Sequence, residues 1–396
     1  MNINDLLKSL VELRGSDLHL KVGSPPIIRV DGELRPQGNE RLSAEALNQM
    51  VYGILDEMQK RTFTSTHELD FAYGVPGIAR FRVNLSMQRG TTRAVMRIVP
   101  FDVKNFKDLN LPEKALTYLC NITYGLVLMT GPTGCGKSTT LAAMVEYMNA
   151  HRNAHIVTVE DPIEFLHRDN KCIISQREVG SDTESFFAAL RHVLRQDPDI
   201  IFIGEMRDLE TIGTALTAAE TGHLVLSTLH TSDAPHTIDR IIDVFPPHQQ
   251  QQIRIQLASC LQGIVSQKLL PLKTGVGRIP ATEVLISTPF IRKMILEAAP
   301  PAEIYHQIIA APEFLNMHTM NRDLVRLYKE EEKINLETAL AATGNPDEFR
   351  LNLRGIYSGS GTMDAVRTQV ESSDAKGGVG EGGFGGRYNK FETDRG

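Results

Sequence analysis

One eight-residue segment of this chain has the residue types and spacing of a phosphate-binding loop. It runs from Gly131 to Ser138 with the sequence GPTGCGKS, which fits G-x-x-x-x-G-K-[ST] at each fixed position. Glycines let backbone N–H groups turn toward phosphate oxygens because no Cβ blocks the approach. The segment predicts a site for a nucleoside triphosphate, with Lys137 near the β- and γ-phosphates and the Ser138 hydroxyl on Mg²⁺.

Acidic and histidine side chains follow three short apolar runs downstream of this loop. Glu160, Asp161 and Glu164 come after the first run, Glu205 after the second and His230 after the third. Glu205 suits a position on Mg²⁺ or its water, and one of the three earlier acids suits polarisation of an attacking water. His230 is placed to sense a γ-phosphate. Taken singly, such acids also serve as helix caps and such a histidine as a structural residue.

The apolar runs predict the scaffold that brings these side chains together. Runs that are apolar on both faces are typical of a parallel sheet covered by helices, that is, of an α/β fold. In such sheets, ligands bind at the carboxyl ends of the strands. The runs are Leu126–Met129, Ile156–Val159, Ile200–Ile203 and Leu224–Leu226.

The first hundred residues have a different pattern and predict a smaller α+β domain. Asp31-Gly32 between two short runs predicts a hairpin, and apolar residues at helical spacing predict a helix over 43–60. A long helix is expected over 249–270 by the same criterion. We expect four regions: 1–99 as the N-terminal domain, 100–112 as a proline-containing linker, 113–370 as the α/β domain with C-terminal helices, and 371–396 as a glycine-rich disordered tail.

Composition restricts the classes of function. Of 396 residues, 41% are hydrophobic and 23% charged, as in ordinary globular chains, and the formal net charge of −6 disfavours a general nucleic-acid binder. The four cysteines form no C-x-x-C pair, so no zinc site is expected. The sequence has no signal-peptide pattern and no run of ~18 uncharged apolar residues, so we expect a cytoplasmic protein that reaches a membrane only through partners.

Four segments of the sequence together resemble the signature elements of the secretion-superfamily hexameric ATPases. GPTGCGKSTT resembles Walker A, VEDPIEF the Asp box, IGEMRDLET a Walker B that lacks the usual aspartate before its glutamate, and TAAETGHLVLSTLHT the His box. Within that superfamily the chain is most similar to the type IV pilus retraction ATPase family, over about residues 3–328. The family's A-I-R-N-L-I-R-E helix motif is altered here at its Ala and Asn positions, in 290–297.

The resemblance implies a role for each matching residue. Glu164 is implied as the catalytic glutamate, Glu205 as the Walker B acid, in contact with Mg²⁺ through water, and His230 as the His-box histidine. Arg82 and Arg97 match two arginines of the N-terminal domain that reach the nucleotide in this family. The implied contacts to ATP are Gly131, Thr133, Gly134, Cys135, Gly136, Lys137, Ser138 and Thr139.

The resemblance also implies an architecture and a function. These are a PAS-like N-terminal domain, a RecA-like P-loop ATPase core, and a homohexameric ring that couples Mg-ATP hydrolysis to type IV pilus retraction and twitching motility. The implied partners are an inner-membrane platform protein and the pilus machinery, at the cytoplasmic face of the inner membrane. An accessory retraction ATPase paralogue is an alternative, and a DNA-translocating RecA-like motor is a weaker one.

Overall fold

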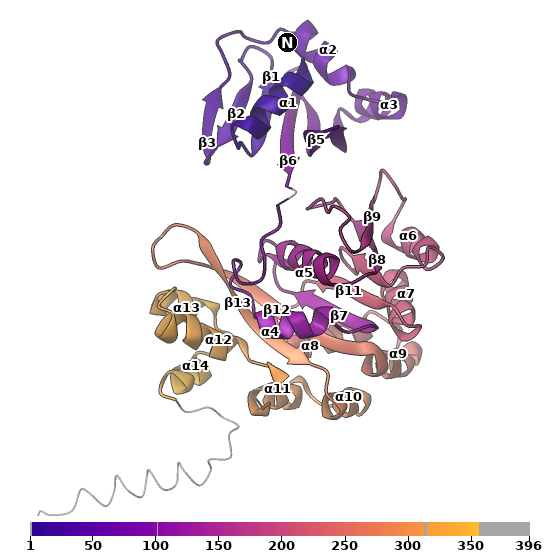
Figure 1. Cartoon of the computed structure of the whole chain (residues 1–396), viewed down its shortest axis with the longest axis vertical. Coiled ribbons are helices and arrows are strands. Elements are labelled where there is room, and N and C mark those ends of the chain that lie inside the picture. Colours follow the sequence, from indigo (N-terminus) through magenta and orange to yellow (C-terminus); the bar gives the residue numbers. More distant parts are fainter. Residues whose placement is uncertain (1, 101, 313–314, 356–396) are drawn as a thin grey trace, which may run out of the picture.

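The computed structural model describes residues 2–100, 102–312 and 315–355. Its N-terminal unit combines three helices with a six-stranded antiparallel sheet of order β3-β2-β1-β6-β5-β4 (Figure 1). The elements are α1 (Ile3–Glu12), β1 (Asp17–Lys21), β2 (Ile27–Val30), β3 (Glu33–Pro36), α2 (Ala44–Tyr52), α3 (Glu57–Thr66), β4 (Glu68–Val75), β5 (Ala79–Gln88) and β6 (Thr91–Val99).

Local sequence signals explain this unit, with one correction. The hairpin predicted at Asp31-Gly32 is confirmed, and both residues have positive φ, at 51° and 85°. The single helix predicted over 43–60 is wrong, because α2 ends at Tyr52 and α3 begins after Asp56. A capping box between Asp56 and Gln59 starts the new helix, and apolar periodicity alone does not register such a cap.

The core unit contains a seven-stranded sheet of order β13-β12-β7-β11-β10-β8-β9. All neighbours in it are parallel except β12 and β13. Its elements are α4 (Glu113–Cys120), β7 (Gly125–Thr130), α5 (Lys137–His151), β8 (His155–Glu160), β9 (Ile173–Glu178), α6 (Phe186–Val193), β10 (Ile200–Ile203), α7 (Leu209–Glu220), β11 (Leu224–Leu229), α8 (Ala234–Asp243), α9 (Pro247–Cys260), β12 (Leu261–Pro271) and β13 (Arg278–Ile286).

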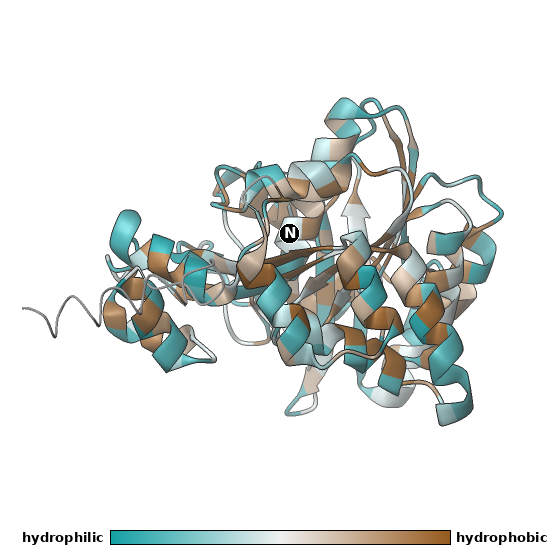
Figure 2. Ribbon diagram, turned by 90° about the horizontal axis from the view of Figure 1, so that it is seen from below, coloured by the Kyte–Doolittle hydropathy of each residue, from teal (hydrophilic) through white to brown (hydrophobic). Residues whose placement is uncertain are grey.

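The central strands of this sheet are buried on both faces. Every residue of β7, β10 and β11 is buried, and the apolar ones belong to one continuous hydrophobic core. Figure 2 shows these hydrophobic strands between helices whose outer faces are hydrophilic. Hydrophobic burial on both sides fixes the sheet, so the carboxyl ends of its parallel strands form one rigid edge. The predicted α/β class with a parallel sheet is confirmed.

The helix predicted over 249–270 is only half right. The chain is helical in α9 up to Cys260 and then becomes β12, which pairs with β7 on one side and β13 on the other. Leu261, Ile264 and Val265 are fully buried in the sheet. Their spacing fits a helix, but their burial between two strands gives them more contact in an extended conformation.

The last C-terminal helices pack beside the β12–β13 hairpin, whereas the two helices that follow β13 pack against α9 and α8 (Figure 1). The predicted tail over 371–396 and the end of the predicted α/β domain lie outside the described residues. In the described part of the chain no helix combines the length and the apolar composition needed to span a membrane. The elements are α10 (Pro289–Leu296), α11 (Pro301–Ala310), α12 (Met320–Val325), the π-helical turn η2 (Arg326–Glu330), α13 (Leu336–Ala342) and α14 (Pro346–Leu353).

Candidate active site

The phosphate-binding loop connects the buried strand β7 to helix α5. Gly131, Gly134 and Gly136 have φ values of 137°, 78° and 96°, which residues with a Cβ rarely adopt. Gly136 is also the N-cap of α5, so the first N–H groups of that helix open toward the loop. A loop of this shape at a helix N-terminus is an anion site, because free N–H groups and the helix dipole both favour negative charge.

Lys137 is held inside this loop. Its Nζ donates to the carbonyl oxygens of Gly131 at 2.7 Å and Pro132 at 3.1 Å, and the side chain is largely buried. Burial lowers the pKa of this ammonium, while the charges of Cys135 and Glu205 favour its protonated form. The two carbonyls therefore hold the Lys137 ammonium beside the loop.

Glu205 and His230 meet at the ends of neighbouring strands. Glu205 Oε1 lies 2.8 Å from His230 Nε2 and 2.7 Å from Arg207 Nε. The two strand ends are joined because Thr228 Oγ1 donates to the Gly204 carbonyl at 2.7 Å. Glu205 raises the pKa of Arg207 by hydrogen bonding. His230 is thus placed to position the acid at this strand end.

Glu160 shapes the Asp box, residues 159–165. The Glu160 carboxylate is buried and accepts from Thr158 Oγ1 at 2.8 Å, from Gln176 Nε2 at 3.2 Å and from the Glu164 backbone N–H at 3.3 Å. Burial raises the pKa of Glu160, although these hydrogen bonds oppose the shift. Because its oxygens accept these hydrogen bonds, Glu160 supports the segment, and the exposed acids that the segment presents to the cavity are Asp161 and Glu164.

Glu164 contacts an arginine of the N-terminal unit. Arg82 Nη2 on β5 lies 3.2 Å from Glu164 Oε1 and also donates to the Ile163 carbonyl at 2.9 Å. The Glu164 side chain is 46% exposed and that of Arg82 29%, so the ion pair is open to the cavity on one side. One guanidinium thereby fixes both the backbone and the carboxylate of the Asp box.

Two further contacts hold the N-terminal unit against the Asp box. Arg80 Nη2 lies 3.4 Å from Glu178 Oε2, and the same oxygen accepts from the Ile163 backbone N–H at 3.2 Å. The Leu166 backbone N–H donates to the carbonyl of Pro100, one residue after β6, at 3.1 Å. The placement of Glu164 therefore depends on residues of both units.

Arg97 is not brought to this cavity within one chain. It lies directly opposite Arg82 in the β5–β6 register, but its Nε donates to Asp17 Oδ1 on β1 at 2.7 Å. The pKa of Asp17 is lowered because hydrogen bonds from Ser16 and Arg97 outweigh the effect of burial. The two arginines, for which the resemblance implies the same role, thus have different partners in the structure: Glu164 for Arg82 and Asp17 for Arg97.

The other predicted site residues lie together around one cavity of about 750 Å³. Gly131 and Cys135 belong to the loop but face away from the cavity, and Cys135 is buried. A volume of this size suits a nucleotide-sized ligand. The predicted residues that line the cavity are Thr133, Gly134, Gly136, Lys137, Ser138, Thr139, Glu160, Asp161, Glu164, Glu205 and His230.

Comparison with known proteins agrees with this geometry. Residues 2–365 match the model of the family described as type II/IV secretion system protein. The chain belongs to the type II/IV secretion system protein family. The match extends over both the N-terminal and the core unit, and the resemblance drawn from the four sequence segments is confirmed.

Relatives within the family are similar over nearly their whole length. The chain is 49% identical over 349 residues to the type IV pilus retraction ATPase PilT of Pseudomonas aeruginosa, covering 88% of this chain and 100% of PilT. It is 40% identical to the type IV pilus ATPase PilU of the same organism, covering 89% and 92%. The predicted recognition of the pilus retraction ATPases is therefore confirmed.

Solved structures of this family have the same fold. A crystal structure of the pilus retraction motor PilT with bound ADP matches with a TM-score of 0.79 and 45% identity, covering 88% of this chain and 98% of PilT. The Legionella pneumophila ATPase DotB matches with a TM-score of 0.73 and 27% identity, covering 89% and 95%. These matches confirm the predicted fold class for the core.

Sequence reasoning missed several residues at the cavity of this family member. Arg207 and Arg278 line it, and Gln267 supports the phosphate-binding loop from below. Arg207 stands two residues after Glu205, so strand-end spacing was a usable signal for it. Arg278 lies on β13 and Gln267 on β12. The strand β12 was not predicted, because its residues were assigned to the helix expected over 249–270.

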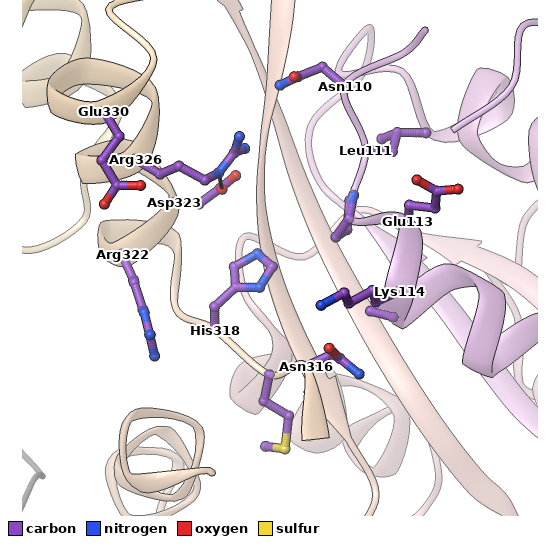
Figure 3. A pocket seen from close by; sticks show the side chains of 13 residues that line it. Asn110, Leu111, Glu113, Lys114, Asn316, His318, Arg322, Asp323, Arg326 and Glu330 are labelled. Atoms are coloured by element: carbon purple, nitrogen blue, oxygen red, sulfur yellow. Dashed lines mark hydrogen bonds and ion pairs between the residues drawn. The ribbon is translucent and has the colours of Figure 1, made fainter. Parts of the chain in front are cut away.

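A second cavity of about 670 Å³ lies between the start of α4 and the C-terminal elements. Figure 3 shows Glu113 and Lys114 on one side, Arg322, Asp323, Arg326 and Glu330 on the other, and His318 between them. Burial lowers the pKa of His318. Asp323 accepts from Arg326 Nε at 2.7 Å, so part of this charge is neutralised locally, and none of the predicted site residues lies here.

Proposed function

We propose that this chain is the motor ATPase of type IV pilus retraction, which hydrolyses ATP in the cavity beside the phosphate-binding loop. The observation that carries the proposal is the convergence of Lys137, Glu205, His230 and Glu164 on one cavity. Membership of the type II/IV secretion system protein family and 49% identity to a pilus retraction ATPase support it.

ATP binding uses the loop and its lysine. The N–H groups at the start of α5 and the ammonium of Lys137 meet the β- and γ-phosphate oxygens, and the glycines let the backbone approach them closely. Ser138 and Thr139 line the same cavity and contribute hydroxyl groups next to these N–H groups. This binding involves the core unit alone.

The residues present fit a magnesium ion carried by the nucleotide. Mg²⁺ prefers oxygen ligands and is commonly held by one or two protein oxygens together with phosphates and waters. Ser138 and Glu205 supply such oxygens in the cavity, and the described residues contain no cluster of three or more His, Cys, Asp or Glu side chains that would form a protein-only site. When bound, the ion would neutralise phosphate charge.

Hydrolysis needs a group that orients water and accepts its proton, and Glu164 takes this role. The attacking water gives its proton to the Glu164 carboxylate, its oxygen bonds to the γ-phosphorus, and the bond to the β-phosphate oxygen breaks to leave ADP. Arg82 fixes the position of Glu164 and supplies positive charge beside that carboxylate. His230 holds Glu205 in place.

The coupling to mechanical work follows from how the cavity is built. Its Asp box is held by Arg80 and Arg82 of the N-terminal unit, while the phosphate-binding loop belongs to the core, so a change of state at the γ-phosphate alters the contact between the two units. In the proposed assembly, six copies form a ring at the cytoplasmic face of the inner membrane. There the ring would act on the pilus machinery through a platform protein.

An accessory retraction ATPase is the second candidate. The 40% identity to PilU over 92% of that protein supports it, against 49% identity over all of PilT. The two roles differ in whether retraction stops when the chain is missing.

Counting pilus retraction events in a strain that lacks this protein tests the proposal. We expect retraction to stop, to return with the wild-type chain, and not to return with Glu205→Gln. Glu303→Gln makes the same chemical change on an exposed residue of α11 and should restore retraction fully. Normal retraction without the protein would reject the main proposal, and a partial loss would favour the accessory role.

A further inference from the structure

Gln267 lies directly beneath the phosphate-binding loop. It is 3% exposed and sits in β12, next to Ser266, which pairs with the last residue of β7, Thr130. The two strands run parallel, so β12 continues past the end of β7 at the point where the loop begins. Gln267 is thereby carried under the loop by a strand of the rigid sheet.

Both ends of the Gln267 amide are used. Its Nε2 donates to the Cys135 carbonyl at 2.6 Å, and its Oε1 accepts from Thr140 Oγ1 in the first turn of α5 at 2.8 Å. A buried carbonyl needs a donor, and the amide supplies one to a loop carbonyl that faces the protein interior. One side chain thus connects the loop to the helix that follows it.

The loop closes tightly around this residue. A Cβ placed on Gly136 would lie 2.7 Å from Gln267 Nε2, and a Cβ placed on Gly131 would lie 2.3 Å from the Gln267 carbonyl oxygen. Glycine is therefore required at both loop positions because Gln267 occupies the space beneath them. The requirement adds to the positive φ that both positions have.

The direction of one peptide group follows from the bond to Cys135. The Cys135 carbonyl and the Gly136 N–H belong to the same planar trans peptide group, so they point in opposite directions. Because Gln267 draws the carbonyl toward the interior, the Gly136 N–H is directed toward the other side, and Gly136 lines the nucleotide cavity. An N–H in that direction is what an anion-binding loop needs.

We propose that Gln267 is a positioning residue of the phosphate-binding loop, which orients the Cys135–Gly136 peptide group so that its N–H faces the nucleotide phosphates. The proposal rests on the proposed function, since it assigns this loop to ATP. Gln267 acts through the backbone and touches no reacting atom.

A Gln267→Glu chain separates orientation from packing. Glutamate has the same shape and still accepts from Thr140, but it donates to the Cys135 carbonyl only when protonated, and burial raises the pKa of such a carboxyl. The measurement is the dissociation constant of a fluorescent ADP analogue between pH 6 and pH 8.5. Relative to wild type, we expect near-normal affinity at the acid end and a loss of about tenfold or more at the alkaline end.

Two further variants complete the test. Thr140→Val removes the partner of Oε1 and leaves the bond to Cys135, so we expect a change in affinity of less than about threefold with the pH profile of wild type. Gln267→Met fills the same space without a donor, and we expect weakened binding at every pH. This variant also keeps the proposal testable if Gln267→Glu does not fold.

The outcomes distinguish this proposal from the proposed function. Wild-type affinity in both Gln267→Glu and Gln267→Met at all pH values would overturn the positioning role. An equal loss at every pH in a folded Gln267→Glu chain would also overturn it, because packing alone would then explain the effect. If the folded wild-type chain binds no ADP analogue while its Lys137→Ala variant behaves identically, the proposed function itself fails.

Discussion

The phosphate-binding loop and the Asp box border the same cavity, but different parts of the molecule support them. The loop is continuous in sequence from Gly131 to Ser138 and is supported from within the core by Gln267. The Asp box is supported in the core by Glu160 and Glu178, and it is held in addition from outside the core. There Arg82 contacts Glu164 and Arg80 contacts Glu178, and both arginines lie on the other side of the linker in sequence. In the proposed mechanism, nucleotide binding therefore uses one unit of the molecule, whereas the geometry for hydrolysis depends on the contact between two units.

This difference has a consequence for a motor. A site whose binding part is rigid and whose hydrolytic part depends on the position of a second unit links turnover to the angle between the units. The side chains of Arg80 and Arg82 are each 29% exposed, so solvent partly screens the charge of these two contacts.

The largest expected effect on ATP binding and hydrolysis comes from removing the positive charge of Lys137. Lys137→Ala should abolish measurable ATP binding and hydrolysis together, because the buried ammonium is the cation closest to the anion site. Equilibrium binding of a fluorescent ATP analogue and phosphate release measure both. Lys273→Ala, an exposed lysine in the β12–β13 turn, is the matched control and should behave as wild type. Retained affinity in Lys137→Ala would remove the basis for placing the phosphates here.

A smaller effect on turnover is expected from a substitution at the contact between the N-terminal unit and the core. Arg82→Ala should lower turnover by about 10- to 100-fold, because the guanidinium that fixes Glu164 is lost. The affinity for ATP should change by less than about fivefold, because the loop stays intact. Steady-state phosphate release and binding titrations on the same preparation give both quantities.

Arg97→Ala and Arg35→Ala sharpen this prediction. Arg35 is exposed on β3 and pairs with Glu33, so its loss should leave both quantities unchanged. Arg97 pairs with Asp17 inside one chain, so a drop in turnover in Arg97→Ala would require that it reaches a nucleotide in the assembled ring. Equal turnover in Arg82→Ala and wild type would contradict the proposed difference between the two segments, since the Asp box would then not depend on the N-terminal unit.

The smallest functional effect is expected at Glu283, a buried carboxyl outside both regions. It accepts from the Ala234 backbone N–H at 2.8 Å, and burial raises its pKa from 4.5 to about 7. The folded chain therefore holds a proton that the unfolded chain has released, and stability falls as the pH rises from about 4.5 to about 7. Glu283→Gln removes this loss while its amide oxygen still accepts the hydrogen bond.

Urea unfolding at pH 5 and pH 8 checks this stability prediction. Glu283→Gln should be more stable than wild type at pH 8, by on the order of 1–3 kcal/mol, and the difference should shrink at pH 5. ATP affinity and turnover should remain those of wild type. A variant that is less stable at pH 8 would contradict the assignment of an ionised, poorly solvated carboxylate at this position.

The sequence was sufficient to predict the structural features that depend on neighbouring residues in the chain. The loop, the strand ends that carry Glu205 and His230, and the Asp31-Gly32 hairpin were all predicted because each depends on residues next to one another in the chain. The strands that precede these side chains are apolar on both faces, which is typical of strands in a sheet covered by helices.

The sequence was insufficient to predict structure where contacts between distant segments determine the conformation or the partner of a residue. Apolar periodicity predicted a helix over 249–270, but residues 261–271 form a strand because they pair with β7 and β13. The position of Gln267 in the sheet was missed for the same reason. The separation of Arg82 from Arg97 depends on Asp17, a partner 80 residues earlier than Arg97. Such contacts have no signature within one segment.

The most direct test of the central claim, that binding and hydrolysis belong to different parts of the cavity, is made on Glu164→Gln. ATP affinity and single-turnover phosphate release are measured on the same sample, with Glu303→Gln as the control. We predict affinity within about threefold of wild type and phosphate release slower by about 10²- to 10⁴-fold. Unchanged phosphate release, or a loss of affinity as large as the loss of rate, would contradict the account.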